Sequence, residues 1–343
     1  MGDAGLLRVA VVLGSLGGAA LVVRVVRDVA LRRSLLDHPN DRSSHTVPRP
    51  RLGGIGVVLP LLAMGGWLVA AGRAPPALLL PLAATGVVAV LGLVDDLRPL
   101  PARLRLAVQV LAATSVVSAS WDRLPAAAGS LGGGLPPAVL APLAVLWIAW
   151  LTNLYNFMDG IDGLAGVQAL LAALALASVA SGAGAGASEF LLLALAGGAA
   201  GFLVFNLPPS SIFMGDVGST AVGFFLGVLP LLPEVRPVAF EPVALALSLF
   251  FLDATTTLAR RIAKGERWYA PHRTHLYQRP VAAGLGHRSV LLAATVGMAA
   301  VAACAAAWPG ARPSARLVLG AAPFVAFGVG WVTVLAVERA RAQ

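Results

Sequence analysis

Long apolar runs alternate with short polar segments along the whole of this 343-residue sequence. Each run is about 17 to 25 residues long, the length that a helix needs to cross the hydrocarbon core of a bilayer. The runs occupy residues 4–26, 53–72, 77–94, 104–120, 138–157, 164–181, 190–207, 217–232, 242–259, 289–308 and 316–337. The run at 217–232 is short and starts in a glycine-rich loop, so the pattern predicts about 10 or 11 transmembrane helices. We expect an all-α polytopic membrane protein whose residues 1–343 form a single integral-membrane domain.

Composition supports this class. Hydrophobic residues make up 58% of the sequence and charged residues 12%, with a mean hydropathy of +0.83. A net charge of +9 would suggest nucleic-acid binding in a soluble protein, but basic residues of membrane proteins collect in cytoplasmic loops. We therefore exclude nucleic acid as a partner. The lone cysteine, Cys304, lies in an apolar run and offers neither a disulfide framework nor a thiolate metal cluster.

The loop charges predict which ends of the helices face the cytoplasm. Loops 27–52, 95–105 and 260–288 and the C-terminal tail carry 6, 3, 7 and 2 Lys or Arg residues. The loops on the other side carry Arg73, Arg123, Arg236, Arg312 and Arg316. The positive-inside rule places the first group in the cytoplasm and the N-terminus outside. The first run lacks a small-residue cleavage site, so we interpret it as a membrane span and not as a signal peptide.

Three acidic clusters fall on this predicted cytoplasmic side. They are Asp95 and Asp96 in VDDL, Asp159 and Asp162 in NFMDGIDG, and Asp216 in FMGDVGST. One such cluster is explained equally well as a solvated helix cap, but three on one side indicate a shared site. Carboxylates suit Mg²⁺, which fills its other positions with water and phosphate oxygens. Basic segments on the same side can hold phosphate. The pattern favours phosphoryl transfer at a membrane surface.

Four motifs in this order resemble those of the polyprenyl-phosphate N-acetylhexosamine-1-phosphate transferases: VDDL, NLYNFMDGIDGLAG, FNLPPSSIFMGDVGST and HRTHLYQR. The resemblance extends from about Asp37 to Arg279. It implies transfer of a sugar 1-phosphate from a UDP-N-acetylhexosamine to a polyprenyl phosphate in the bilayer, with release of UMP. It also implies Mg²⁺ as cofactor, with Mn²⁺ as an alternative, and a multi-pass protein of the bacterial inner membrane with a cytoplasmic active site. A homodimer is left open.

The resemblance also implies roles for individual residues. Asp95 and Asp96 match paired aspartates, one proposed as base and one on the metal side, and Asp216 matches the principal Mg²⁺ ligand. The implied catalytic residues are Asp95, Asp96, Arg105, His272 and His275, and the implied metal ligands are Asp216 and Asp96. Substrate binding is assigned to Asn156, Asp159, Asp162, Phe213, Arg42 and His45. Arg105 stands where the family usually has lysine, and its planar fork suits bidentate phosphate contact.

Several residues keep a second interpretation. His272 and His275 could form a metal pair or a polar surface patch instead of lying beside the diphosphate. Phe213 could stack on uracil or pack in the core. Asp253 lies inside an apolar run, and an intramembrane acid is a functional candidate; pairing with Arg260 or Arg261 would explain it equally well.

The segment after His275 bears on the substrate. Relatives that use UDP-N-acetylglucosamine carry several histidines there, whereas this chain has Leu276, Tyr277 and Gln278. This resembles the branch that acts on 6-deoxy sugars such as N-acetylfucosamine or N-acetylquinovosamine, at the first membrane step of a bacterial surface polysaccharide such as lipopolysaccharide. A UDP-N-acetylglucosamine enzyme remains the alternative. A secondary transporter would place its acids near the bilayer midplane, and a CDP-alcohol phosphotransferase would gather them within one helix pair.

Overall fold

The computed structural model describes residues 3–37, 47–132, 134–184, 186–234, 237–266 and 272–342, and within these ranges the protein consists of helices and loops. The α-helices are α1 (Asp3–Arg32), α2 (Ile55–Ala70), α3 (Leu79–Leu97), α4 (Ala102–Ala119), α5 (Leu124–Ala127), α6 (Pro137–Phe157), α7 (Leu164–Gly182), α8 (Ala187–Asn206), α9 (Asp216–Val228), α10 (Phe240–Ala246), α11 (Ser248–Ala263), α12 (Gln278–Ala282), α13 (His287–Ala307) and α14 (Pro313–Ala342). Short 3₁₀ turns lie at Pro76–Leu78, Trp121–Arg123, Gly129–Gly132 and Leu229–Leu231. The predicted all-α class is confirmed.

The predicted membrane spans correspond to helices in the same order. Within the described ranges, 8 helices are long and apolar enough to cross a membrane, and the bent pair α10 and α11 could supply a ninth. The remaining two predicted spans correspond to the shorter apolar helices α2 and α9. The multi-pass architecture is confirmed, and α9, one of the two shorter helices, begins at Asp216 of an acidic cluster.

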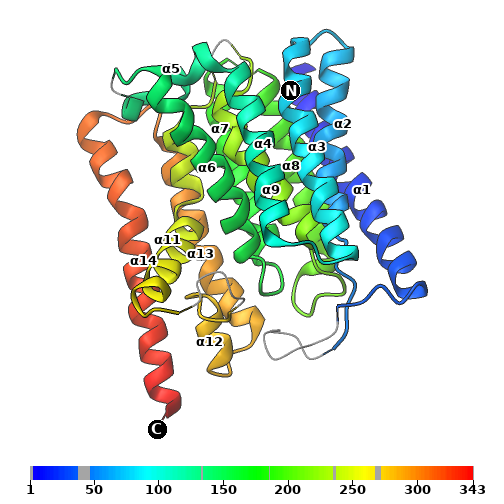
Figure 1. Cartoon of the computed structure of the whole chain (residues 1–343), viewed down its shortest axis with the longest axis vertical. Coiled ribbons are helices and arrows are strands. Elements are labelled where there is room, and N and C mark those ends of the chain that lie inside the picture. The colour runs from blue at the N-terminus through cyan, green and yellow to red at the C-terminus, as the bar shows by residue number, and fades with distance from the viewer. Residues whose placement is uncertain are drawn as a thin grey trace.

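The expected span at 242–259 is broken. Helix α10 ends at Ala246, α11 begins at Ser248, and the two axes differ by 71°. The second half of α11 reads TTTLARR, which is too polar for the centre of a bilayer. In Figure 1, α11 accordingly lies obliquely beside α13 and α14.

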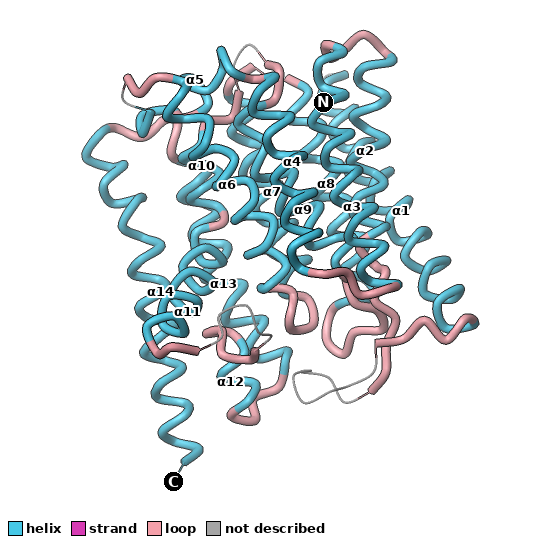
Figure 2. The backbone as a smooth tube through the Cα atoms, viewed as in Figure 1, coloured by secondary structure: helices cyan, strands magenta, loops and turns pink. Residues whose placement is uncertain are grey.

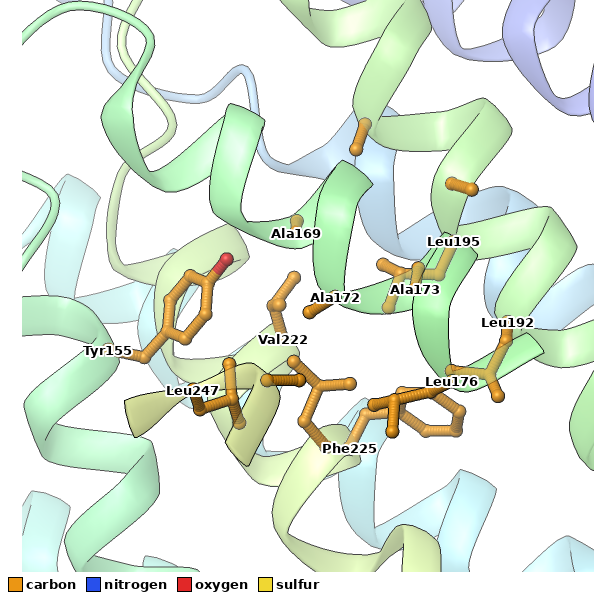
Figure 3. Close-up of a cluster of buried hydrophobic side chains, with 14 of the residues drawn as sticks. Tyr155, Ala169, Ala172, Ala173, Leu176, Leu192, Leu195, Val222, Phe225 and Leu247 are labelled. Carbon is orange, nitrogen blue, oxygen red and sulfur yellow. The ribbon is translucent and has the colours of Figure 1, made fainter. Parts of the chain in front are cut away.

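The core lies where α7 and α8 pack against α9 and α10. Alanines on α7, including Ala169, Ala172 and Ala173, let the neighbouring helices approach closely (Figure 3). Small residues favour helix association in lipid, because burying apolar side chains there gives no net hydrophobic gain. Around them, larger side chains such as Tyr155 and Phe225 fill the remaining space. These central helices form a fixed frame from which the loops project.

The loops after α1, α3, α6 and α8 lie together at one end of the bundle, with α12 beside them (Figures 1 and 2). Close approach of α2 and α9 helps to gather them. A β-carbon on Gly218 would lie 2.5 Å from the Cα of Gly54, so both positions need glycine for the helices to meet. The predicted acidic clusters therefore share one end of the molecule.

Candidate active site

The end of α3 and the start of α9 are joined by Asp96. Its Oδ1 accepts a hydrogen bond from the backbone N–H of Asp216 at 3.0 Å, and its Oδ2 accepts one from Val217 at 3.0 Å. A carboxylate at a helix N-terminus satisfies free N–H groups and interacts favourably with the helix dipole. This contact fixes Asp216, 120 residues away in sequence, directly beside Asp96.

Arg105 balances two carboxylates of this group. Its Nη1 donates to Asp95 Oδ2 at 2.5 Å and to Asp216 Oδ2 at 3.1 Å. Asp95 Oδ1 also accepts a hydrogen bond from the N–H of Leu100 at 2.6 Å, which closes the turn between α3 and α4. The guanidinium thus links α4 to the ends of α3 and α9, as a fork of fixed geometry can.

The turn after α6 brings Asp159 to the same place. Burial raises the pKa of the Asp159 carboxyl well above its ordinary value, and the negative charges of Asp216, Asp96 and Asp162 raise it further. Nearby, Asn156 Oδ1 accepts a hydrogen bond from the hydroxyl of Ser219 on α9 at 2.9 Å. Carboxylates crowded in this way favour the binding of a cation or a proton.

Asp162 lies only three residues further along but has its own set of donors. Its carboxylate accepts hydrogen bonds from the Ser210 hydroxyl at 2.8 Å and the Ser210 N–H at 3.1 Å, and Arg49 Nη1 lies 3.3 Å away. Burial alone would raise the pKa of Asp162, but His287 and the two Ser210 donors outweigh it and lower the pKa to about 2. Asp162 therefore ties four separate segments together.

We expect Asp162→Asn to destabilise the protein by about 1–3 kcal/mol, because an amide cannot replace a carboxylate held by several donors. Since the folded pKa lies below the ordinary value of 3.8, this stabilisation is present above pH 4 and is lost as the pH falls towards about 2. Thermal unfolding of the purified protein at pH 7 measures the effect. Asp28→Asn is the matched control, since Asp28 pairs with its neighbour Arg27 on α1. Equal melting temperatures for both variants would contradict this role.

These residues surround a cavity of about 220 Å³ at the loop end of the bundle. Its lining comprises Asp37, Arg51, Asp96, Asn156, Asp159, Gly160, Ile161, Asp162, Asn206, Phe213, Gly215, Asp216, Gln278 and His287. We call it the carboxylate cavity, because five of these side chains are aspartates. The start of α13 also faces it, through His287, whereas the start of α9 is already capped by Asp96. Helix N-termini attract anions, so the cavity combines carboxylate oxygens that could bind a cation with a helix start that could bind phosphate.

The donor set fits Mg²⁺ bound together with a phosphate ligand. Among the described residues, no three His, Cys, Asp or Glu side chains form a ready-made metal site. Mg²⁺, however, is usually held by one or two carboxylates and completes its octahedron with water and substrate phosphates. Asp216 and Asp96 can supply these two, because each carboxylate oxygen that accepts a backbone hydrogen bond retains a second lone pair.

Comparison with known proteins supports one family. A model of glycosyl transferase family 4 matches residues 78–233. The chain is 28% identical over 299 residues to a probable undecaprenyl-phosphate N-acetylglucosaminyl 1-phosphate transferase of Bacillus subtilis, covering 81% of this chain and 78% of that protein. It is 29% identical over 333 residues to a decaprenyl-phosphate N-acetylglucosaminephosphotransferase of Mycobacterium tuberculosis, covering 86% of this chain and 81% of that protein. The chain is similar over most of its length to polyprenyl-phosphate hexosamine-1-phosphate transferases, which supports a sugar-phosphate transferase.

A shorter stretch of the transferase resembles a third protein. Over 78 residues it is 41% identical to a phospho-N-acetylmuramoyl-pentapeptide-transferase of Rhodopseudomonas palustris. This match covers 23% of the chain and 21% of that protein. The family model ends before the histidine segment, so residues 272–279 lie outside the matched region.

The structure separates the predicted site residues of the transferase into two groups. Asp96, Asn156, Asp159, Asp162, Phe213 and Asp216 line the carboxylate cavity, and Arg105 and Asp95 contact Asp216. Phe213 is not simply a core residue, because its ring lies at the cavity and 5.8 Å from the Arg49 guanidinium. His272 and His275 lie elsewhere, and Arg42 and His45 fall outside the described residues. The roles themselves stay predictions.

The two histidines pack together behind the cavity. Their ring centroids are 4.8 Å apart, and His275 is buried with Nδ1 3.3 Å from Asp253 Oδ1. Burial, together with the charges of His275, Arg261 and Arg260, lowers the pKa of His272 to about 4. His272 is therefore neutral at pH 7, which does not suit it to neutralise a phosphate from its present position.

Sequence reasoning missed four residues that line the cavity of the transferase: Arg51, Asn206, Gln278 and His287. Asn206 closes the α8 turn, accepting a hydrogen bond from Gly163 N–H at 2.9 Å and donating one to Ile212 O at 2.8 Å. Arg51 forms a salt bridge with Asp37. A usable signal was present for two of them, because Asn206 opens the NLPPSS motif and Gln278 belongs to the histidine motif.

Proposed function

We propose that this transferase moves an N-acetylhexosamine 1-phosphate from a UDP-sugar to undecaprenyl phosphate, releasing UMP, at the first membrane step of a bacterial surface polysaccharide such as lipopolysaccharide. The observation that carries the proposal is the carboxylate cavity, where five aspartates meet at one end of an apolar helical bundle. We assign the protein to the inner membrane, with this end in the cytoplasm, because the basic loops lie on the same side.

Mg²⁺, or Mn²⁺ in its place, is the proposed cofactor, and Asp216 and Asp96 are its proposed ligands. When bound, such an ion neutralises charge on a diphosphate and stabilises the leaving phosphate. Arg105 and the start of α13 are placed to hold the remaining negative charge. Asn156, Asp159 and Phe213 are placed to contact the nucleotide, and the Phe213 ring offers a flat face for uracil.

The proposed chemistry is direct attack. An oxygen of the polyprenyl phosphate forms a bond to the β-phosphorus of the UDP-sugar, and the bond from that phosphorus to the bridging oxygen breaks, releasing UMP. A phosphate monoester loses its second proton near pH 6, so no strong base is needed at pH 7. Asp95 is engaged by Arg105 and Leu100, and Asp96 by the start of α9. These contacts favour a positioning role for both over a covalent aspartyl-phosphate.

A second cavity is suited to the lipid tail of the acceptor. It has a volume of about 520 Å³, lies between α11, α13 and α14, and is lined mainly by apolar side chains such as Leu249, Val296 and Val334. Leu276 and Tyr277 form part of its wall, and the next residue, Gln278, lines the carboxylate cavity. A polyprenyl chain seated here would therefore place its phosphate near the reacting diphosphate.

We expect Gly330→Leu to raise the KM for undecaprenyl phosphate severalfold without changing the KM for the UDP-sugar. Gly330 lines the apolar cavity on α14, where a leucine side chain would occupy space needed by the tail. Gly328→Leu is the matched control, because a β-carbon there meets nothing within 4 Å. Steady-state kinetics in detergent with each substrate varied in turn would measure this. An unchanged acceptor KM would place the tail elsewhere.

Two sugar classes are candidates. Tyr277 and Gln278 in place of histidines favour a 6-deoxy-N-acetylhexosamine, whereas the names of the relatives favour N-acetylglucosamine. Purified protein incubated with undecaprenyl phosphate, Mg²⁺ and a panel of UDP-sugars should release UMP with one class at least tenfold faster than with the other. No UMP release with any donor would contradict the proposed function. Radiolabelled phosphosugar trapped on the protein without acceptor would contradict direct attack.

A further inference from the structure

One buried carboxylate of the membrane domain, that of Asp253, takes no part in the proposed chemistry. Asp253 on α11 is 4% exposed. Its Oδ1 accepts hydrogen bonds from the Leu276 N–H at 2.8 Å and the Thr257 hydroxyl at 3.1 Å, and its Oδ2 accepts one from the Tyr277 N–H at 3.2 Å. His275 Nδ1 lies 3.3 Å from Oδ1. Asp253 thus holds residues 275–277, which we call the histidine turn.

The arginines considered as partners for Asp253 are engaged differently. Arg260 donates to the carbonyl oxygen of Thr274 at 2.9 Å, and Arg261 Nε lies 3.1 Å from Glu266 Oε2. Pairing with an arginine was one of two interpretations of Asp253, and its carboxylate accepts hydrogen bonds from a turn more than 20 residues away in sequence. Arg260 holds Thr274, the residue immediately before the histidine turn.

The histidine turn lies next to a wall of the carboxylate cavity, because Tyr277 contacts Gly160 and Gln278 follows it in sequence. The Tyr277 hydroxyl donates to the carbonyl oxygen of Phe157 at 2.9 Å, at the end of α6. This hydroxyl also packs so closely on Gly160 that no β-carbon would fit there. Burial, followed by the charges of Asp253 and Asp159, raises the pKa of Tyr277, so the hydroxyl remains a donor at neutral pH. The next residue, Gln278, lines the cavity.

Resting on the proposed function, we propose that Asp253 is a positioning residue for the transfer reaction, which fixes the histidine turn so that Tyr277 and Gln278 hold the Asp159 side of the carboxylate cavity in its working shape. An intramembrane acid is more often a carrier of protons or ions. Here both carboxylate oxygens accept hydrogen bonds from a fixed turn and a helix hydroxyl, which is the arrangement of a structural anchor.

The first test is local and needs no activity. Asparagine at position 253 has one acceptor oxygen, so Asp253→Asn leaves either the Leu276 or the Tyr277 N–H facing a donor. We expect amide hydrogen exchange in residues 275–280 of the full-length protein to become at least tenfold faster, with peptides from α3 and α9 unchanged. Exchange that stays at the wild-type rate in residues 275–280 would overturn the proposal.

The second test links the anchor to catalysis. Loss of a hydrogen bond to a charged group corresponds to about a 10- to 100-fold effect, and we expect kcat/KM of Asp253→Asn to fall by this factor. Tyr277→Phe removes the hydrogen bond from this turn to Phe157, and its kcat/KM should fall by about three- to tenfold. Because both substitutions release one element, the double variant should be no worse than Asp253→Asn alone. Multiplying effects would indicate that Asp253 acts independently of the turn.

Glu241→Gln is the matched control. Glu241 is a buried carboxylate on α10, the other half of the bent helix pair, and accepts hydrogen bonds from the N–H and hydroxyl of Ser130 at 2.5 and 2.6 Å. Glu241→Gln should lower the stability of the protein and speed amide hydrogen exchange near Ser130, while kcat/KM stays within about twofold of the wild-type value. If Asp253→Asn does not fold, Tyr277→Phe alone must speed exchange in residues 275–280. A wild-type protein that releases no UMP would refute the proposed function, while the exchange result would still decide the role of Asp253.

Discussion

Replacing Asp216 with asparagine is expected to lower kcat for sugar-phosphate transfer by about 10³-fold, the scale seen when a charge-stabilising group is removed from an active site. Asp216 lines the carboxylate cavity and contacts Arg105 at 3.1 Å. Asparagine keeps the size of the side chain and leaves the backbone bond from residue 216 to Asp96 intact. The change removes the negative charge and one acceptor oxygen, which a bound cation and Arg105 would use.

UMP release and thermal unfolding, measured on the same preparation, separate lost chemistry from lost folding. Asp122→Asn serves as the control, because Asp122 is an exposed aspartate in the short turn after α4, at the opposite end of the bundle. It should retain wild-type kcat. A loss of less than tenfold for Asp216→Asn, in a protein that remains folded, would remove Asp216 from the centre of the site.

The second large effect is expected from Gly215→Ala, a change of one methyl group. Gly215 has φ +74° and ψ 171°, a conformation that is essentially restricted to glycine. An added β-carbon would collide with the carbonyl oxygen of Arg51 and lie 2.6 Å from Asp96 Oδ2. The Asp96 carboxylate must then move off the start of α9. Misplacement of a catalytic group by about 1 Å can cost about 10²-fold in rate, and we expect a loss of this size.

Gly72→Ala isolates the backbone contribution to this result. Gly72 also has positive φ, at +66°, but a β-carbon there meets nothing within 4 Å. Its substitution should cost about 1–2 kcal/mol of stability through the backbone alone and leave kcat unchanged. If both glycine variants lost activity equally, general destabilisation, and not displacement of Asp96, would explain the effect.

The fold was largely predictable because the length and hydrophobicity of a segment identify a membrane span. Apolar runs of spanning length gave the helices and their order, and alternation then placed the acidic clusters at one end. The break at Leu247 was not predictable in the same way. The sequence PVALALSLFFL is apolar except for Ser248, and the bend separates α10 from α11 without a glycine or proline at the joint.

Within the site, residue type was predictable but partners were not. Asp159 and Asp162 share one motif, yet Asp162 is held by Ser210 and Arg49 from distant loops, whereas Asp159 faces like charges. No local pattern distinguishes them. Likewise, the spacing of His272 and His275 does not reveal that His275 contacts Asp253, inside an apolar run, and does not line the carboxylate cavity. Such pairings depend on how α11 bends.

The central claim is that the aspartates at one end of the bundle form a single divalent-cation and diphosphate site. Anomalous scattering from Mn²⁺, in crystals of the protein grown with Mn²⁺ and UDP, tests it most directly. We expect one strong peak in the carboxylate cavity, at coordination distance from Asp216 and from a phosphate oxygen, which disappears in Asp216→Asn. A peak beside His272 and His275, or bound UDP without Mn²⁺ in the cavity, would contradict it.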